Sequence, residues 1–126
     1  MFTHMFLGSN NMDRSRQFYQ AALAPLGRQN VMPGDAPRLI FPSETSTLIV
    51  GPPANGEPTN PSNGFTVGFA APDTAAVDAF HAAGLANGGT DECAPGHRPN
   101  APGNAYGAYL RDPDGHKLCA FCQMPE

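Results

Sequence analysis

The chain has 126 residues, a net charge of −4 and only 14% charged residues. This length predicts one folded domain, and the lack of a basic stripe argues against nucleic acid or an anionic membrane surface as a partner. No apolar run is long enough to span a membrane and no signal peptide is visible. An odd set of three cysteines without an export signal fits a reducing compartment better than a disulfide framework, so we expect a cytoplasmic protein.

The first eight residues form a short apolar run that predicts a strand. Side chains alternate along a strand, so Phe2, His4 and Phe6 share one face. A helix-like pattern follows and runs to Leu23, where Pro25 and a nearby glycine end it. The first segment therefore has the order strand then helix.

Three short strand candidates come next, separated by Pro-Gly and Pro-Ser turns, at residues 28–31, 38–41 and 47–51. A stretch rich in Pro, Asn and Gly then connects the two halves of the chain. We interpret the whole chain, 1–126, as one domain made of module one (about 1–52), this linker (about 53–63) and module two (about 64–126).

The second half repeats the pattern. It predicts, in order, a strand at 65–70, a helix at 74–85, a strand at 90–93, a Gly/Pro-rich loop at 94–104 and a hairpin of strands 106–111 and 117–123. His81 lies among alanines on the helix and His116 follows a turn glycine, so we expect both to be exposed.

A faint internal repeat supports two related modules. Residues of the first copy have counterparts 62 positions later: His4 and Thr66, Phe18 and Phe80, Leu23 and Leu85. The order β-α-β-β-β therefore occurs twice, which predicts an α+β fold with each helix on one face of a mostly antiparallel sheet. A unit of roughly 60 residues is marginal alone, so the copies share a core or exchange with a second chain.

Four segments resemble the vicinal-oxygen-chelate superfamily, which includes glyoxalase I, extradiol dioxygenases and bleomycin-resistance proteins. These segments are Asp13-Arg14-Ser15-Arg16-Gln17-Phe18-Tyr19 with Ala24-Pro25-Leu26-Gly27, Gly68-Phe69-Ala70-Ala71-Pro72, Val77-Asp78-Ala79-Phe80-His81-Ala82-Ala83-Gly84, and Asp112-Pro113-Asp114-Gly115-His116-Lys117-Leu118. The resemblance implies two βαβββ modules that form a half-open barrel around a cavity.

In that family, a divalent metal ion is held by side chains of the first and last strands of each module. The resemblance places these positions at His4, Thr66, Cys119 and the apolar segment 47–50. His4 is a good metal ligand, Cys119 a weak candidate because the family commonly has Glu there, and Thr66 a weak candidate because a hydroxyl binds such ions poorly. A firmly held ion needs three or four protein donors, so this set argues against the usual glyoxalase I activity.

The same resemblance and the strand pattern indicate which side chains line a small-molecule pocket. Lys117, Cys119 and Phe121 share the strand face that the family turns toward the cavity. The loop at 94–104 is long enough to act as a lid. With it, the substrate-pocket candidates are Phe6, Arg98, Tyr106, Tyr109, Lys117 and Phe121, with Arg98 as a partner for an anionic group. Cys119 and Cys122 point to opposite faces of one strand, which argues against a shared metal.

Two functions remain open. One is a metal-dependent lyase, isomerase or dioxygenase that uses zinc, nickel, manganese or iron held by His4 and other residues. The other is a metal-free protein that binds or sequesters a small molecule, as in the bleomycin-resistance branch. The resemblance also implies a homodimer.

Overall fold

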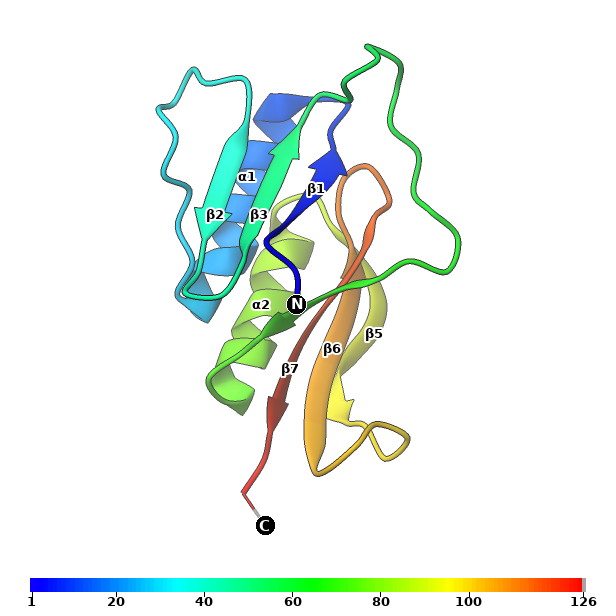
Figure 1. The fold of residues 1–126 in the computed structure, drawn as a ribbon. Coiled ribbons are helices and arrows are strands. Elements are labelled where there is room, and N and C mark those ends of the chain that lie inside the picture. The colour runs from blue at the N-terminus through cyan, green and yellow to red at the C-terminus, as the bar shows by residue number, and fades with distance from the viewer. Residues whose placement is uncertain (126) are drawn as a thin grey trace.

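A computed structural model describes residues 1–125, so residue 126, the last of the predicted second module, lies outside it. The protein has two small sheets and two α-helices (Figure 1). The elements are β1 (His4–Gly8), α1 (Met12–Leu23), a 3-10 helix (Ala24–Leu26), β2 (Leu39–Pro42), β3 (Thr47–Gly51), β4 (Val67–Ala70), α2 (Thr74–Ala86), β5 (Thr90–His97), β6 (Ala105–Arg111) and β7 (Lys117–Gln123). Neither helix is long and apolar enough to cross a membrane within the described residues.

The first sheet has the order β1-β3-β2, with β1 parallel to β3 and β2 antiparallel to it. Asn11 caps the N-terminus of α1: its side chain accepts a hydrogen bond from the Arg14 N–H and so satisfies one of the free donors of the first turn. The helix buries Phe18, Tyr19 and Leu23 along one stripe. Gly27 then turns the chain in the left-handed region, with φ 78°.

The strand predicted at residues 28–31 does not form, which is a correction to the sequence analysis. The Asn30 side chain takes the place of a strand partner, because its Oδ1 accepts from the N–H groups of Met32 and Ile40 at 3.1 and 3.0 Å. Val31 makes one backbone bond to Ile40 and Pro33 follows. A side chain that bonds the local backbone competes with a regular ladder, so the first sheet has three strands instead of four.

The second sheet has the order β4-β7-β6-β5 and contains all the elements of a βαβββ unit. Strand β5 extends to His97, beyond the predicted end at residue 93, with register shifts along its pairing with β6. An edge strand tolerates Pro95 because one side needs no ladder bond. The loop predicted at 94–104 is therefore shorter, and begins at Arg98.

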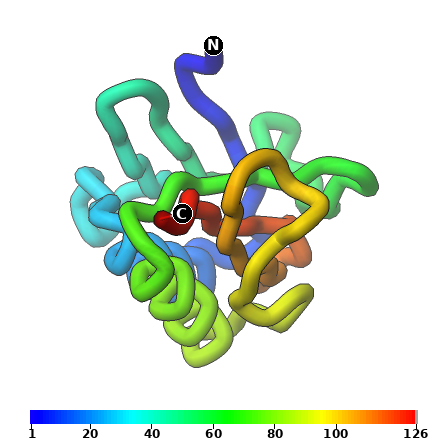
Figure 2. The backbone as a smooth tube through the Cα atoms, turned by 90° about the horizontal axis from the view of Figure 1, so that it is seen from below, coloured from blue at the N-terminus to red at the C-terminus, as the bar shows by residue number. Residues whose placement is uncertain are grey.

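The repeat is visible in the packing, and the α+β prediction of two modules in a half-open arrangement is confirmed. Phe18 and Phe80, 62 positions apart, are both fully buried. Leu23 and Leu85 differ, with exposed fractions of 1% and 39%. The helices contact each other and cover the same side of the molecule, as a view turned by 90° shows (Figure 2). One hydrophobic core runs through both modules.

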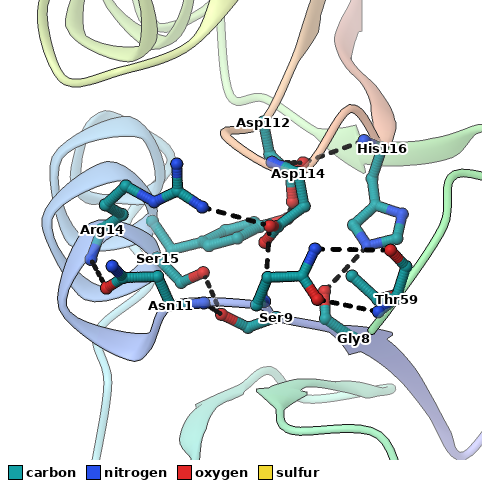
Figure 3. Close-up of polar contacts among 11 residues, drawn as sticks. Gly8, Ser9, Asn11, Arg14, Ser15, Thr59, Asp112, Asp114 and His116 are labelled. Carbon is teal, nitrogen blue, oxygen red and sulfur yellow. Dashed lines mark hydrogen bonds and ion pairs between the residues drawn. The ribbon is translucent and has the colours of Figure 1, made fainter. Parts of the chain in front are cut away.

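A buried polar network joins the last hairpin of module two to the start of module one (Figure 3). The Tyr19 hydroxyl of α1 donates to Asp112 Oδ2 at 2.5 Å, and Asp112 Oδ1 accepts from the N–H groups of Asp114 and His116 at 2.9 Å. His116 Nε2 donates to the Gly8 carbonyl oxygen at 2.8 Å. His116 is only 7% exposed, so the prediction of an exposed side chain is wrong. Its ring is buried because it reaches across to β1.

The turn that carries Asp112 also contacts the first turn of α1, through Asp114. Asp114 forms an ion pair with Arg14 at 3.6 Å and accepts from the Asn10 N–H at 3.3 Å. Beneath it, the buried hydroxyls of Ser9 and Ser15 lie 2.6 Å apart. The turn at residues 112–116 therefore contacts both the end of β1 and the beginning of α1.

Removal of the Tyr19 hydroxyl should weaken this junction. Tyr19→Phe leaves a buried Asp112 oxygen without its donor, so we expect the free energy of unfolding to fall by about 1–3 kcal/mol. In an Asp112→Asn background the loss should shrink by about 0.5–3 kcal/mol because the two groups are coupled. Urea unfolding of the four proteins measures this. Additive effects would contradict a direct junction bond.

The junction also predicts a pH dependence. Burial raises the pKa of Asp112 above its usual value, although the Tyr19 hydroxyl and His116 act in the opposite direction. A carboxyl with a raised folded-state pKa stabilises the fold below its unfolded pKa, and that contribution is lost as the pH rises through the folded-state value. The stability of Asp112→Asn relative to wild type should therefore increase from pH 4 to pH 7. A constant or falling difference in urea titrations would be contrary to this account.

Candidate functional site

The candidate site lies on the face of the two sheets that points away from the helices, called here the open face. Strand alternation decides which side chains lie there. In β1, Leu7 is buried and Met5 packs against the core, so His4 and Phe6 belong to the opposite, exposed face. In β7 the corresponding residues are Lys117, Cys119 and Phe121, because Leu118 and Ala120 lie in the core.

His4 is exposed at the start of β1, where its register partner in β3 is Thr47. Its Nδ1 lies 2.8 Å from the Thr3 hydroxyl oxygen. Across residues 1–125, no three His, Cys, Asp or Glu side chains are grouped so that they could hold a metal ion. His4 thus contributes one donor from the first sheet, while Cys119 lies in the second.

Cys119 is buried beside Gly68, where an added Cβ would lie 3.3 Å from the Cys119 sulfur. Burial raises the pKa of its thiol to about 11, although Lys117 acts in the opposite direction. Thr66 precedes β4 and is exposed. One imidazole on the first sheet, one buried thiol on the second and one hydroxyl do not form a donor set for a divalent ion within the described residues.

Two cations and one further aromatic ring lie next to Tyr109 of β6. Tyr109 and Phe121 meet edge to face, with ring centroids 5.7 Å apart. The Lys117 nitrogen lies 5.1 Å from the Tyr109 centroid and the Arg98 guanidinium carbon 5.7 Å from it, both within the range of cation–π attraction. Cys119 is the register partner of Tyr109. We call these five residues the Tyr109 cluster.

The cations of the Tyr109 cluster have no carboxylate partner within 4.0 Å in the part of the chain that the structure describes. Arg98 Nη2 donates to the Ala94 carbonyl at 2.6 Å, which fixes the guanidinium. Its Nε is buried and makes no hydrogen bond with the described residues. With no carboxylate paired to Arg98 or Lys117, this part of the open face carries positive charge that favours an anion.

The segment after Arg98 is tied back to the sheet. The Arg98 N–H donates to the Ala105 carbonyl at 2.8 Å and the Asn104 N–H donates to Gln123 Oε1 at 2.8 Å. Gln123 Nε2 in turn donates to the Pro102 carbonyl at 3.3 Å. These bonds hold both ends of the segment that the sequence predicts to be a lid, and they place Arg98 at its beginning.

Tyr106 is not part of the Tyr109 cluster. It lies three positions before Tyr109 in β6, so its side chain points to the helix side, where it packs against the core. Its hydroxyl donates to Asp78 Oδ1 of α2 at 2.5 Å. The structure therefore brings Arg98, Tyr109, Lys117 and Phe121 together, but separates Tyr106 and Phe6 from them, with Phe6 on the first sheet.

Sequence reasoning also misplaced His81. This residue is 8% exposed, and its Nε2 lies 2.7 Å from Asp91 Oδ1 at the start of β5. The face of α2 that carries His81 packs against the second sheet, so the side chain is covered rather than exposed. In contrast, Cys119 and Cys122 do lie on opposite faces, because Cys122 belongs to the core on the helix side.

Two cavities lie near the boundary of the modules. The larger, of about 490 Å³, is bordered by the β2–β3 turn, the end of α1 and β4. The smaller, of about 380 Å³, is lined by Phe6, Arg38 and the linker prolines. The sequence analysis missed Arg28 and Arg38, which lie on these two cavities. In the sequence, each of these arginines lies next to an apolar strand or the end of a helix. That pattern is too common to identify a binding residue.

Comparison with known proteins decides the family. A family profile for the Glyoxalase/Bleomycin resistance protein/Dioxygenase superfamily matches residues 2–120. This chain belongs to that superfamily. A crystal structure of a glyoxalase/bleomycin resistance protein from Albidiferax ferrireducens T118 is 46% identical, with a TM-score of 0.88, covering 95% of this chain and 97% of the other. No curated protein sequence matches significantly.

Two more distant superfamily structures share the fold. Lactoylglutathione lyase from Agrobacterium tumefaciens is 23% identical with a TM-score of 0.62, covering 94% of this chain and 90% of its own. The V278E mutant of glyoxalase I from Zea mays is 23% identical with a TM-score of 0.69, covering 94% of this chain and 44% of its own. The superfamily resemblance inferred from the sequence is thus confirmed, and these two likenesses show the fold alone.

The raised thiol pKa predicts an order of cysteine reactivity. Cys93 is exposed, whereas Cys119 and Cys122 are buried and have raised pKa values. Because the thiolate is the reactive form, iodoacetamide at pH 7.5 should alkylate Cys93 first. Labelling of Cys119 should be far slower and should accelerate about tenfold per pH unit up to pH 9.5. Peptide mass spectrometry measures the rates, and equal rates at Cys93 and Cys119 would contradict this assignment.

Proposed function

We propose that this superfamily member binds a small molecule with a planar aromatic part and an anionic group, on the open face and without a metal ion. The observation that carries the proposal is the Tyr109 cluster, in which Arg98 and Lys117 both approach one ring and no carboxylate pairs with either within the described residues. A planar guanidinium suits a carboxylate, which it binds through two parallel hydrogen bonds.

The aromatic side chains supply the second half of this binding surface. Tyr109 and Phe121 offer an edge and a face, and a ligand ring prefers offset or edge-to-face contact with such groups. Cys119 adds a small neutral surface, because its protonated thiol does not cancel the charge of Lys117. On the first sheet, Phe6 is 45% exposed and with His4 provides a further aromatic surface on the open face.

A metal-dependent reaction finds less support. The positions that the family uses for ligands carry His4, Thr66 and Cys119, and within the described residues no three His, Cys, Asp or Glu side chains are grouped around them. A firmly bound ion needs three or four. We therefore assign His4 to contact with the ligand rather than to a metal centre.

We also propose a homodimer. Phe2 and Phe65 are large apolar residues with exposed fractions of 60% and 44%, and we assign them to the surface that contacts the second chain. Sedimentation equilibrium should give twice the mass of one chain. A single-chain mass at micromolar concentration would oppose this proposal.

Binding of simple aromatic acids tests the proposed function. We expect 2-naphthoate to bind more tightly than neutral 2-naphthamide, and Arg98→Gln or Lys117→Gln to weaken naphthoate binding about tenfold each, because one charged hydrogen bond is lost. Titration calorimetry or NMR chemical shifts give the affinities. Arg16→Gln, which changes an arginine of α1 that borders neither cavity and pairs with Asp13, should leave naphthoate affinity unchanged.

The same titration distinguishes the metal-dependent alternative. Prior dialysis against EDTA should leave the naphthoate affinity unchanged. His4→Gln should lower that affinity by no more than about threefold, which is within the effect of one lost neutral contact. Stoichiometric metal in the purified protein, with naphthoate binding that disappears on chelation, would refute metal-free binding.

A further inference from the structure

A second candidate site lies where the two modules meet, away from the Tyr109 cluster. We call the 490 Å³ cavity there the junction pocket. One wall comes from module one, with Met5, Leu23, Leu26, Phe41 and Leu48, and the other from β4 of module two, with Val67 and Phe69. Its volume falls within the range of small-molecule sites, roughly 300–1,000 Å³.

The pocket exists because the two sheets do not join. Strand β1 pairs only with β3 and strand β4 only with β7, and no ladder connects β1 to β4. The helices close the gap on one side, since α1 and α2 pack together. What remains is a cavity whose apolar walls belong to different modules.

The mouth of the junction pocket is polar. Ser43, Thr45, Ser46 and Thr47 of the β2–β3 turn and Thr66 before β4 supply hydroxyl groups at the rim. Arg28, after the end of α1, is the single charged residue among those that border it. No carboxylate of the described residues lies within ion-pair distance of Arg28. An apolar interior with one unpaired cation at its mouth is complementary to an apolar acid.

We propose that the junction pocket binds a monocarboxylic acid with an aliphatic body, its chain between the module walls and its carboxylate at Arg28. This site is separate from the proposed function, because none of the residues of the Tyr109 cluster borders the pocket. Such a ligand contacts both modules at once, so it stabilises their pairing as well as the folded chain.

The smaller cavity is a weaker candidate for the same ligand. Phe6 and Arg38 border it together with linker residues, and its volume is about 380 Å³. Its walls come mainly from loop residues and one face of the first sheet, so it offers no apolar surface from module two.

The test is a titration of the full chain with hexanoate, octanoate and decanoate. Each added methylene that enters the apolar interior should strengthen binding about fourfold, until the pocket is full. Octanoate should also raise the melting temperature, whereas octylammonium should not bind. No saturable octanoate binding, or equal binding of octylammonium, would overturn the proposal.

Two variants locate the site. Arg28→Gln should weaken octanoate about tenfold and leave 1-octanol unchanged, because only the acid uses the guanidinium. Thr66→Trp should fill the mouth and abolish octanoate binding, whereas Thr90→Trp, at an exposed threonine of β5 outside the pocket, should retain it. Full octanoate affinity in Thr66→Trp would overturn the placement.

A direct contact measurement removes dependence on the variants. In the wild-type protein, NMR should show nuclear Overhauser contacts from the octanoate chain to the methyl groups of Met5 and Leu26. Contacts to Phe121 or Tyr109 instead would assign octanoate to the open face and overturn the junction site. Arg98→Gln and Lys117→Gln should leave octanoate binding intact, so failure here is distinguishable from failure of the proposed function.

Discussion

The buried hydrogen bond from Tyr19 to Asp112 is the constraint on which the rest of the architecture depends. It joins the first helix of module one to the final hairpin of module two, at 2.5 Å and out of contact with water. Asp112 is also the acceptor that shapes its own turn. One carboxylate therefore fixes both the local hairpin and the relation of the modules, and the junction pocket, whose walls come from both modules, depends on that relation.

The two modules share a strand-helix-strand arrangement but carry different side chains at equivalent positions. The first copy presents His4 and Phe6 on the open face, where the second has Thr66 and Gly68 at the repeat-related positions. The absence of a side chain at Gly68 leaves room for the Cys119 sulfur. The cations of the open face that could bind a ligand therefore lie in module two, together with the aromatic rings of the Tyr109 cluster.

Much of this fold is predictable from local pattern. The internal repeat pairs Phe18 with Phe80, which are both buried, and strand alternation separates Cys119 from Cys122, because the strand period acts within a few residues. The two wrong histidine predictions have a different cause. His81 and His116 are buried by partners that lie 10 and 108 positions away, at Asp91 and Gly8. The sequence does not show which remote backbone or carboxylate will cover a polar ring, and the junction pocket exists only once the modules are placed.

A crystal structure with 4-bromobenzoate would test the central claim most directly, because the bromine is located by its anomalous scattering and needs no assumption about binding mode. We expect the ring beside Tyr109 and Phe121, with its carboxylate toward Arg98 and no metal between ligand and protein. Bromine density away from the Tyr109 cluster, or a carboxylate that binds a metal ion held by His4, would contradict the account.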